Sequence, residues 1–314
     1  MAFAGSAPPV DARTVATLRP GEDVDALFAC TRKDRAISRS GQPYLTVELR
    51  DSSGSILGRA FREADVLSAR FEQGELVRVR GRVERFREQL QLELRSIDSA
   101  VEQDVEPSRF LPSSQRDLDE LEGFLEHLAR ELYDAGLRGL VARVLGDVAL
   151  RAEIRRAPCS LPPGPGSARA GASSRVAVHH AYLGGLLEHT VAVATLAIEL
   201  CAVHPRLDRD LLLCAAIVHD LGKTREFTYG ARIERSREGA MLGHLELGLR
   251  VIAEHAPPAF EGERRLALEH CVMLHHGPDA ASGRRFASAE ALALYRLNAL
   301  DAQLKATLEH RRSA

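Results

Sequence analysis

The chain has no excess of charge of either sign, which removes one direct indication of function. Its 42 Lys and Arg stand against 44 Asp and Glu, for a formal net charge of −2. A protein with this balance has no overall basic surface that would demand nucleic acid as a partner. Composition alone therefore does not point to a nucleic-acid-binding protein.

The five cysteines form no Cys-x-x-Cys pair, and the chain has no internal repeat. Scattered cysteines are typical of a reducing compartment, where most are buried and inert. The N-terminus lacks the basic start and the apolar run of a signal peptide. We also find no run of about 18 apolar residues, so we expect no membrane-spanning segment and no membrane partner. These absences predict a cytoplasmic protein.

At 314 residues the chain is long enough for two domains, and its character changes near residue 105. Residues 22–100 contain short runs that alternate apolar and polar residues, as in Leu45-Thr-Val-Glu-Leu49, which is typical of half-buried antiparallel strands. Residues 62–72 predict a short helix between the third and fourth of five strands. The pattern predicts a small closed barrel over residues 21–105, after a flexible tail over residues 1–20.

The barrel contains two distinctive segments and a Gln-Leu-Gln-Leu strand that follows them. The segments are Leu49-Arg-Asp51-Ser-Ser-Gly54-Ser-Ile56 and Phe71-Glu-Gln-Gly74-Glu-Leu-Val77-Arg-Val-Arg-Gly81. Together they resemble the OB-fold of the tRNA-anticodon-binding type over roughly residues 22–100. That fold implies a barrel with one face that binds oligonucleotides or oligosaccharides.

Three arginines and two aromatic residues are the candidates for such a face. Arg78, Arg80 and Arg82 alternate with valines, so their guanidinium groups share one face of a strand. Tyr44 and Phe86 could stack on bases, which predicts binding of single-stranded RNA or DNA. The alternative is a solvated strand face with aromatic rings in the core. The balance of acidic and basic residues in the barrel counts toward this alternative.

The second half of the chain is predicted to be helical to its end. Leucines at helical spacing predict one helix near 118–132, and a second follows over about 137–156. Residues 158–174 are rich in Pro, Gly and Ser and predict a surface loop. From Val176 onward we expect helices alone.

Histidines and carboxylates recur in five of these predicted helices. They are His189, the adjacent His219 and Asp220, His244, the pair His275 and His276, and Asn298 with Asp301 about one turn apart. One buried histidine is usually a hydrogen-bonding core residue, but five helices that each offer a ligand indicate a metal site in a bundle. Imidazole with carboxylate suits Mn, Fe, Co, Ni or Zn better than Ca or Mg. Glu188 and Glu246 flank two histidines and are candidates to orient their rings.

The sequence segments that surround these residues are also distinctive. It reads His179-His-Ala-Tyr-Leu-Gly-Gly-Leu-Leu-Glu-His189-Thr, His219-Asp-Leu-Gly-Lys223, Leu242-Gly-His244, His275-His-Gly277 and Asn298-Ala-Leu-Asp-Ala302. It resembles the HD superfamily of metal-dependent phosphohydrolases, and more closely the YhaM family of 3′-to-5′ exoribonucleases, which joins an OB-fold to an HD domain. The resemblance implies a multidomain α and β protein, with an N-terminal β-barrel (OB-fold) followed by an all-α HD-type helical domain over residues 106–314.

The resemblance also implies one or two divalent metal ions, with Mn expected first and Fe, Co, Ni or Zn as alternatives. Two sets of ligands are implied, which share one carboxylate. His189, His219 and Asp220 would hold the first ion with a group from the last helix, and Asp220 would bridge to a second ion held by His244 and by His275, His276 or both. Such a pair of ions can cleave a phosphodiester.

Other residues are assigned by the same resemblance. Lys223 would neutralise a substrate phosphate, although a basic residue there can also simply cap a helix. His179 and His180 match the family and are candidates for substrate contact. The family generally has Asp where this chain has Asn298, whose neutral carbonyl oxygen is a weaker donor. We nevertheless expect Asn298 rather than Asp301 to complete the first metal position.

These observations favour a metal-dependent 3′-to-5′ exoribonuclease that hydrolyses single-stranded RNA, with DNA as a possible substrate. Two alternatives remain open. One is an HD phosphohydrolase that acts on small or cyclic nucleotides, and the other is a nucleic-acid-binding protein whose HD site is impaired by Asn298. The sequence does not predict the oligomeric state.

Overall fold

The structure is a computed structural model that describes residues 13–37, 41–100, 106–162, 179–280 and 285–310. Its contacts divide the chain into two units. The barrel unit comprises Met1–Pro112 with Tyr229–Arg232, and the helical unit comprises Ser113–Thr228 with Ile233–Ala314. Each unit has its own apolar core. The predicted order of a barrel followed by a helical domain is confirmed.

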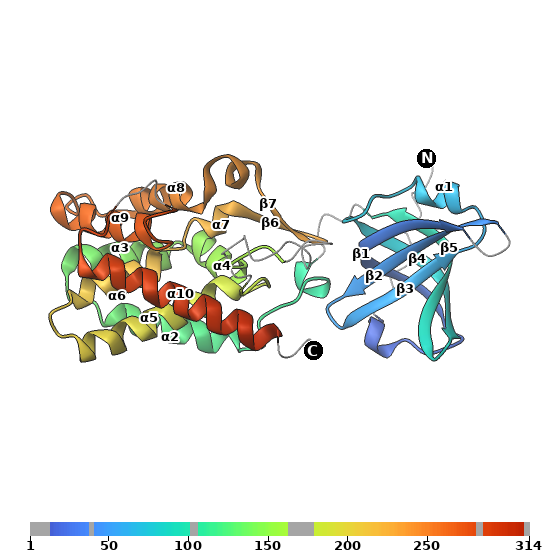
Figure 1. The fold of residues 1–314 in the computed structure, drawn as a ribbon, viewed down its shortest axis with the longest axis horizontal. Helices are drawn as coiled ribbons and strands as arrows, with labels where there is room; N and C mark the ends of the chain where they lie inside the picture. The colour runs from blue at the N-terminus through green and yellow to red at the C-terminus, as the bar shows by residue number, and fades with distance from the viewer. Residues whose placement is uncertain (1–12, 38–40, 101–105, 163–178, 281–284, 311–314) are drawn as a thin grey trace, which may run out of the picture. The chain divides into compact units, whose positions relative to one another are not determined.

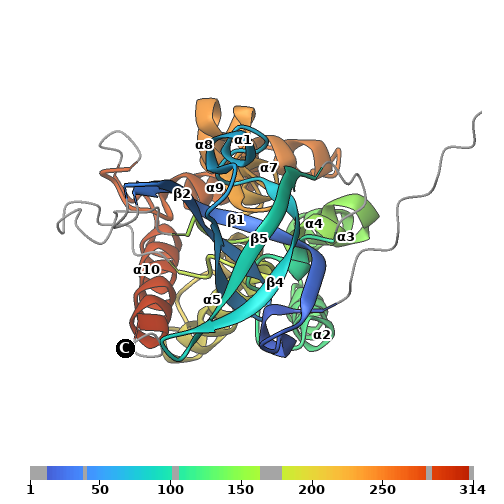
Figure 2. The ribbon, with the colours of Figure 1, turned by 90° about the vertical axis from the view of Figure 1, so that its right-hand side faces the viewer.

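Five strands close the barrel in the order β1-β2-β3-β5-β4 (Figures 1 and 2). They are β1 (Asp23–Ile37), β2 (Pro43–Asp51), β3 (Gly54–Ala60), β4 (Leu76–Phe86) and β5 (Gln89–Ser99). The pairs are antiparallel except for β3 with β5, which is parallel. The short helix α1 (Ala64–Ser68) lies between β3 and β4 in the sequence, as predicted.

Alternation along β4 explains both the core and the outer face of the barrel. Val77 and Val79 are fully buried, whereas Arg78 between them is half-buried and Arg80 and Arg82 after them are exposed. Successive side chains of a strand point to opposite sides of the sheet, so the valines fill the barrel and the arginines face outward. The predicted shared face of the arginines is therefore present.

The helical unit contains nine described helices, shown from green to red in Figure 1. They are α2 (Leu118–Arg130), α3 (Ala135–Gly146), α4 (Val148–Arg156), α5 (Gly185–Val203), α6 (Arg209–Val218), α7 (Lys223–Glu226), α8 (Arg237–His255), α9 (Glu263–Leu274) and α10 (Ala289–His310). Helix α5 packs against α2, α6 and α10, and α6 also packs against α9. The ends of these packed helices bring residues far apart in the sequence to one place.

Two predictions of secondary structure were wrong. The expected helix over 137–156 is broken at Asp147, whose side chain accepts hydrogen bonds from the backbone of Ala149 and Leu150 and so begins α4. The chain after Val176 is not entirely helical, because a hairpin of β6 (Phe227–Tyr229) and β7 (Ile233–Arg235) follows α7. Most of the predicted loop 158–174, from residue 163 on, lies outside the described residues.

Helix α5 corrects the expectation that no segment is long and apolar enough to span a membrane. By length and composition alone, Gly185–Val203 passes that test, and 56% of its apolar window is buried inside the protein. A helix that packs on several sides needs apolar residues around much of its circumference. The same helix carries the buried polar residues Glu188 and His189, so its apolar character suits a core helix.

Candidate metal centre and nucleic-acid-binding face

Asp220 lies at the centre of the candidate metal site. It follows the end of α6, and both it and the preceding His219 are buried. Its two carboxylate oxygens face different groups of histidines. Oδ2 lies 3.3 Å from Nε2 of His219 and 3.6 Å from Nε2 of His189, whereas Oδ1 lies 3.3 Å from Nε2 of His275. The carboxylate therefore has a separate oxygen for each of two ligand groups.

The first metal position consists of His189, His219 and Oδ2 of Asp220. One ligand atom from each of these residues lies within 4.8 Å of the others. Nδ1 of His219 donates a hydrogen bond to the carbonyl of Ala216 at 2.9 Å. This bond fixes the ring and leaves the lone pair of Nε2 directed at the site, as metal-binding histidines usually require.

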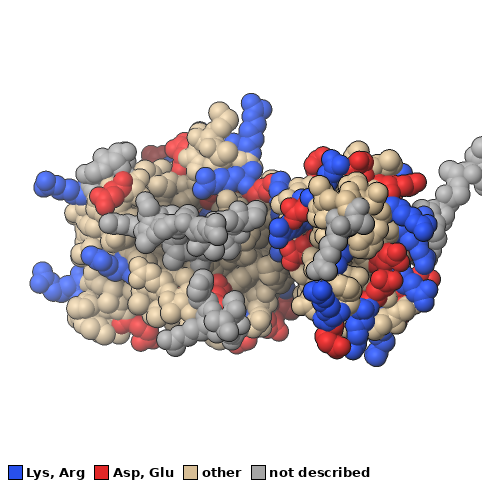
Figure 3. Space-filling model, turned by 45° about the vertical axis from the view of Figure 1, so that its right-hand side comes forward, with Lys and Arg blue, Asp and Glu red and all other residues tan. Residues whose placement is uncertain are grey.

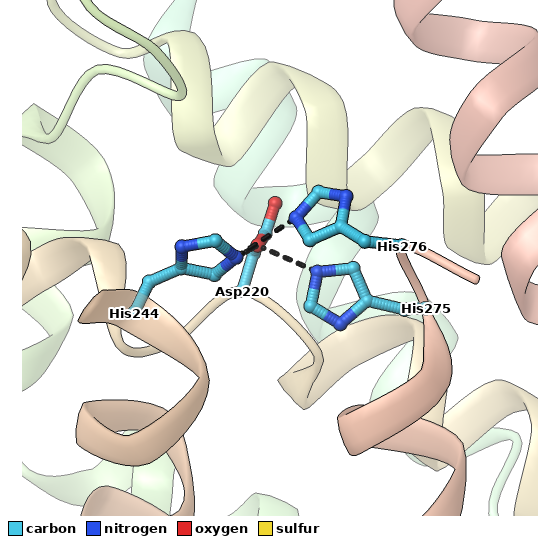
Figure 4. A group of neighbouring side chains, drawn as sticks. All are labelled: Asp220, His244, His275 and His276. Carbon is cyan, nitrogen blue, oxygen red and sulfur yellow. Dashed lines mark hydrogen bonds and ion pairs between the residues drawn. The ribbon is translucent and has the colours of Figure 1, made fainter. Parts of the chain in front are cut away.

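The second metal position consists of Oδ1 of Asp220 with His244, His275 and His276 (Figure 4). Nε2 of His244 lies 3.8 Å from Oδ1 of Asp220 and 2.8 Å from Nε2 of His276. Nδ1 of His275 donates to the carbonyl of Val272 at 2.6 Å, which again directs Nε2 inward. The predicted ligands from α8 and from the end of α9 thus converge on one carboxylate.

The chemistry of these residues fits divalent metal ions. Oδ1 of Asp220 and Nε2 of His275 are buried and have no hydrogen-bond partner among the residues that the structure describes. Burial lowers the pKa of His189 and of His275 to about 4, in each case against an opposing carboxylate. Neutral imidazoles with free lone pairs beside an ionised carboxylate are ready to bind a metal ion without first losing a proton.

Lys223 supplies a buried positive charge next to the shared carboxylate. Its Nζ lies 2.7 Å from Oδ2 of Asp220, and its side chain is 6% exposed. Burial alone would raise the pKa of Asp220, but Lys223 and His219 outweigh burial and hold that pKa well below its usual range. Lys223 begins the short α7, so the alternative of a basic residue that caps a helix C-terminus does not describe its contacts.

On the last helix, α10, it is Asp301 and not the expected Asn298 that contacts a histidine of the first metal position. Oδ2 of Asp301 accepts hydrogen bonds from Nδ1 of His189 at 2.6 Å and from Nε2 of His180 at 3.0 Å. The amide nitrogen of Asn298 instead donates to the backbone carbonyl of His275 at 3.0 Å. This geometry favours Asp301 over Asn298 as the partner of the first metal position, because Asp301 sets the orientation of His189.

Glu188 and Glu246 were candidates to orient histidines, but their described contacts are with other residues. Glu188 is held by Ser114, Tyr182 and Lys305, and Glu246 pairs with Arg250 at the surface. The residue that orients a histidine is Glu226, which no sequence pattern indicated. Its Oε2 lies 3.3 Å from Nδ1 of His244, and the residue is buried. Such a carboxylate fixes the tautomer of a metal-binding histidine.

The candidate substrate residues His179 and His180 are also near the site but are buried. They are 4% and 1% exposed. Nδ1 of His180 contacts the hydroxyl of Tyr182 at 2.9 Å, which continues a hydrogen-bonded chain from Asp301 to Glu188. Burial of this degree favours positioning roles over contact with substrate.

Gly222 allows the turn after Asp220 to approach α8 closely. A Cβ atom on Gly222 would lie 1.9 Å from the carbonyl oxygen of His244 and 2.5 Å from the backbone nitrogen of Gly248. Both are backbone atoms, which cannot move aside as a flexible side chain can. The glycine therefore permits the contact that places His244 beside Asp220.

In the barrel unit, the three predicted arginines share a face but are partly matched by an acidic residue. Asp25 on β1 accepts hydrogen bonds from Arg78 at 2.7 Å and from Arg80 at 2.9 Å. On the barrel face seen in Figure 3, basic and acidic side chains are interspersed. The predicted arginine face is therefore present, and Asp25 offsets the charge of two of its three arginines.

Aromatic rings form a better candidate interface on the barrel. Tyr44 stacks on Phe61 with ring centroids 5.4 Å apart, and Phe61 is 53% exposed. Phe86 is 47% exposed and lies under the guanidinium groups of Arg59 and Arg87. Exposed aromatic rings with adjacent arginines can stack on the bases of a single strand. Phe61 belongs to the same candidate interface through its contact with Tyr44.

Comparison with known proteins supports the assignment of both units. The HD domain family matches residues 186–307, and the family described as an OB-fold nucleic acid binding domain matches residues 30–99. The 3′-5′ exoribonuclease YhaM of Bacillus velezensis is 28% identical over 259 residues, which are 82% of this chain and 77% of the relative. This chain is a homologue of the YhaM exoribonucleases.

Further YhaM relatives support the relationship over nearly the whole chain. The protein of Oceanobacillus iheyensis is 29% identical across 82% of this chain and 76% of its own length. That of Bacillus pumilus is 27% identical over 304 residues, which are 95% of this chain and 92% of the relative. The two units are thus an OB-fold barrel followed by an HD domain.

Proposed function

We propose that this protein is a metal-dependent 3′-to-5′ exoribonuclease that hydrolyses the phosphodiester bonds of single-stranded RNA, with DNA as a possible second substrate. The observation that carries the proposal is the position of Asp220, whose two oxygens face two groups of histidines. The YhaM relatives add the reaction, and the OB-fold adds a means of holding a strand. We place the protein in the cytoplasm.

Each group of residues would hold one divalent ion, and we propose Mn. His189, His219 and Asp220 form the first position, and Asp220 also serves the second position with His275 and its neighbours. Divalent ions bound there would supply an activated water and would stabilise the leaving oxygen of a phosphodiester. Imidazole and carboxylate donors suit Mn, and Fe, Co, Ni or Zn remain alternatives.

The chain's own residues prepare the site for this reaction. Asp301 and Glu226 orient His189 and His244, so the ring nitrogens that face the site are fixed before an ion arrives. Lys223 keeps positive charge beside Asp220. We propose that its ammonium would turn from Asp220 to a phosphate oxygen of the bound substrate. A positioned charge of this kind stabilises the negative charge that develops at the transferred phosphate.

One experiment separates the proposed activity from its alternatives. A 5′-labelled single-stranded RNA is incubated with the purified protein and Mn, and the products are sampled over time. A 3′-to-5′ exonuclease yields a descending ladder, and a blocked 3′ end suppresses it. Cleavage of small or cyclic nucleotides with an unchanged RNA would favour the phosphohydrolase alternative. A gel shift of the RNA with no hydrolysis by any of the metals would favour a binding protein.

A further inference from the structure

A cysteine lies beside the first metal position, although no cysteine was expected in the site. Cys159 is 1% exposed, and its Sγ accepts a hydrogen bond from Nζ of Lys223 at 3.2 Å. The same sulfur lies 3.7 Å from Oδ2 of Asp220. Its thiol is therefore in direct contact with the charged pair at the centre of the candidate metal site.

Two histidines complete a group around this sulfur. One ligand atom each from Cys159, His179 and His189 lies within 4.8 Å of the others, and all three residues are buried. Nδ1 of His179 has no hydrogen-bond partner among the described residues, although the side chain is 96% buried. An unpartnered buried ring nitrogen costs free energy unless something binds it. It is thus an independent sign of a missing ligand.

Backbone contacts hold Cys159 and His179 in place. The backbone nitrogen of Cys159 donates to the carbonyl of His180 at 3.0 Å, and the hydroxyl of Ser160 donates to the carbonyl of His179 at 2.7 Å. The segment that ends at residue 162 is therefore fastened to the segment that begins at residue 179. The positions of the sulfur and the imidazole are fixed by these contacts.

We infer that Cys159, His179 and His189 form a separate position for a thiophilic divalent ion, with Zn²⁺ as the expected occupant. Thiolate and imidazole donors select zinc, whereas the carboxylate-centred positions suit manganese. The thiol gives up its proton to the solvent as the zinc–sulfur bond forms, and the ammonium of Lys223 moves away from the sulfur. Because His189 belongs to both groups, zinc at this thiolate position competes with the ion of the first metal position.

The inhibitory consequence rests on the proposed exonuclease function, but zinc binding itself does not. Zn²⁺ should therefore inhibit hydrolysis that Mn²⁺ supports, through loss of His189 from the first metal position. Replacing Cys159 removes the anionic ligand of the thiolate position. It should raise the half-inhibiting zinc concentration by at least about tenfold, the lower end of what an outer-shell partner contributes to metal affinity.

Cobalt spectroscopy tests the thiolate position without reference to activity. Full-length protein is freed of metal with a chelator and titrated with Co²⁺, a spectroscopic substitute for zinc. The wild type should develop a near-ultraviolet thiolate-to-cobalt charge-transfer band, which Cys159→Ser should lack. Cys201→Ser is the matched control, because Cys201 is also a buried free thiol, and it should keep the band. A wild type without the band, or a band that survives Cys159→Ser, would overturn the inference.

A measurement on the wild type covers the case in which Cys159→Ser fails to fold. X-ray absorption of the zinc-loaded protein should include one sulfur neighbour at about 2.3 Å. Zinc surrounded by nitrogen and oxygen alone would contradict the proposed position. If the sulfur neighbour is present but the protein hydrolyses no RNA, the thiolate position stands and the exonuclease proposal fails.

Discussion

Asp220 is the residue on which both proposed metal positions depend, and its buried negative charge is compensated by one neighbouring ammonium group. The carboxylate is fully buried, and Lys223 compensates its charge at 2.7 Å. Removing one partner of a buried ion pair leaves the other charge unpaired, which destabilises a protein by about 3–5 kcal/mol. A loss of activity after mutation of Asp220 alone could therefore arise from loss of stability as well as from loss of metal.

A paired substitution separates these two effects. Asp220→Asn combined with Lys223→Met removes both charges, so the double variant should melt closer to the wild-type temperature than Asp220→Asn alone. Both variants should lose at least about a hundredfold in Mn-dependent RNA hydrolysis, because a direct ligand matters no less than its outer-shell partners. Bound metal is measured by elemental analysis. Wild-type metal content and activity in the folded double variant would refute the shared-carboxylate arrangement.

The contrast between Asp301 and Asn298 gives a second prediction. Asp301→Asn should raise the Mn concentration for half-maximal activity by about 10–100-fold, because the carboxylate no longer fixes the ring of His189. Asn298→Ser should have a smaller effect, since its hydrogen bond goes to a backbone carbonyl. The reverse order of the two effects would restore Asn298 as the ligand expected from the sequence.

Glu226 gives a third prediction, with Glu246 as its control. Glu226→Gln removes the negative charge next to Nδ1 of His244 and should weaken metal binding about tenfold or more. Glu246→Gln removes the same charge from an exposed pair with Arg250 and should leave metal binding unchanged. Calorimetric titration of the metal-free proteins with Mn measures both. Equal affinities in the two variants would count against a positioning role for Glu226.

The sequence predicted the ligands better than it predicted their partners. His219 and Asp220 stand in a short motif with Lys223, so their proximity can be read from adjacent positions. Asp301 reaches His189 across 112 positions, and neither Asp301 nor its neighbours in the sequence indicate that contact. Hydrogen bonds that orient a ligand depend on how helices pack, and periodicity alone does not fix that packing.

At the level of elements, the turn from α6 to α7 places the ligands, and Gly222 is its critical residue. Gly222→Ala should push α8 away from the turn, because the new methyl group would overlap the backbone of His244. We expect a destabilisation of about 1–3 kcal/mol, typical of overpacking, together with weaker metal binding. Gly146→Ala is the control, since a Cβ there meets nothing within 4 Å. Thermal melting and Mn titration measure both effects, and an unperturbed Gly222→Ala variant would show that the close approach is dispensable.

Element boundaries were predicted less well where a polar side chain competes with the helix. Asp147 stands within a pattern that is otherwise helical on both sides, yet its carboxylate binds the backbone ahead of it and divides the pattern into α3 and α4. The hairpin after α7 escaped prediction because β6 and β7 are three residues each, too short to establish an alternating period.

On the scale of the whole molecule, the two units divide binding and chemistry. The aromatic pair Tyr44 and Phe61 belongs to the barrel unit, so its loss should affect the capture of a strand and leave the metal positions intact. Tyr44→Ala with Phe61→Ala should weaken binding of a long single-stranded RNA by at least about 1–3 kcal/mol, the contribution of one stacked base. Hydrolysis of a small model phosphodiester should not change.

Two controls sharpen this prediction. Tyr133→Ala removes an exposed aromatic ring from the helical unit and should leave RNA affinity unaltered. Arg80→Ala should weaken binding less than the double aromatic variant, because Asp25 already offsets the arginine. Fluorescence anisotropy with labelled RNA measures the affinities at one fixed salt concentration, since contacts to phosphate depend on salt. A larger effect from Arg80→Ala would reinstate the basic stripe as the interface.

The fold class as a whole was predictable, because strict alternation and helical spacing occupy separate halves of the chain. The charge distribution on the barrel was not. Arg78 and Arg80 are evident in the sequence, but Asp25 comes to lie beside them only through the pairing of β1 with β4. The apparent strength of a basic cluster therefore depends on the neighbouring strand, which a linear sequence does not display.

The ion pair of Lys223 with Asp220 bears on the order in which the protein folds and binds metal. Many metal-binding domains cannot fold until their ion arrives, because their ligands are unsatisfied without it. In this protein an ammonium group already stands at the carboxylate and supplies the positive charge that burial demands. We therefore expect the newly made chain to complete its helical core first and to bind metal ions afterwards. Scarcity of metal would then abolish the activity of the protein without causing it to unfold.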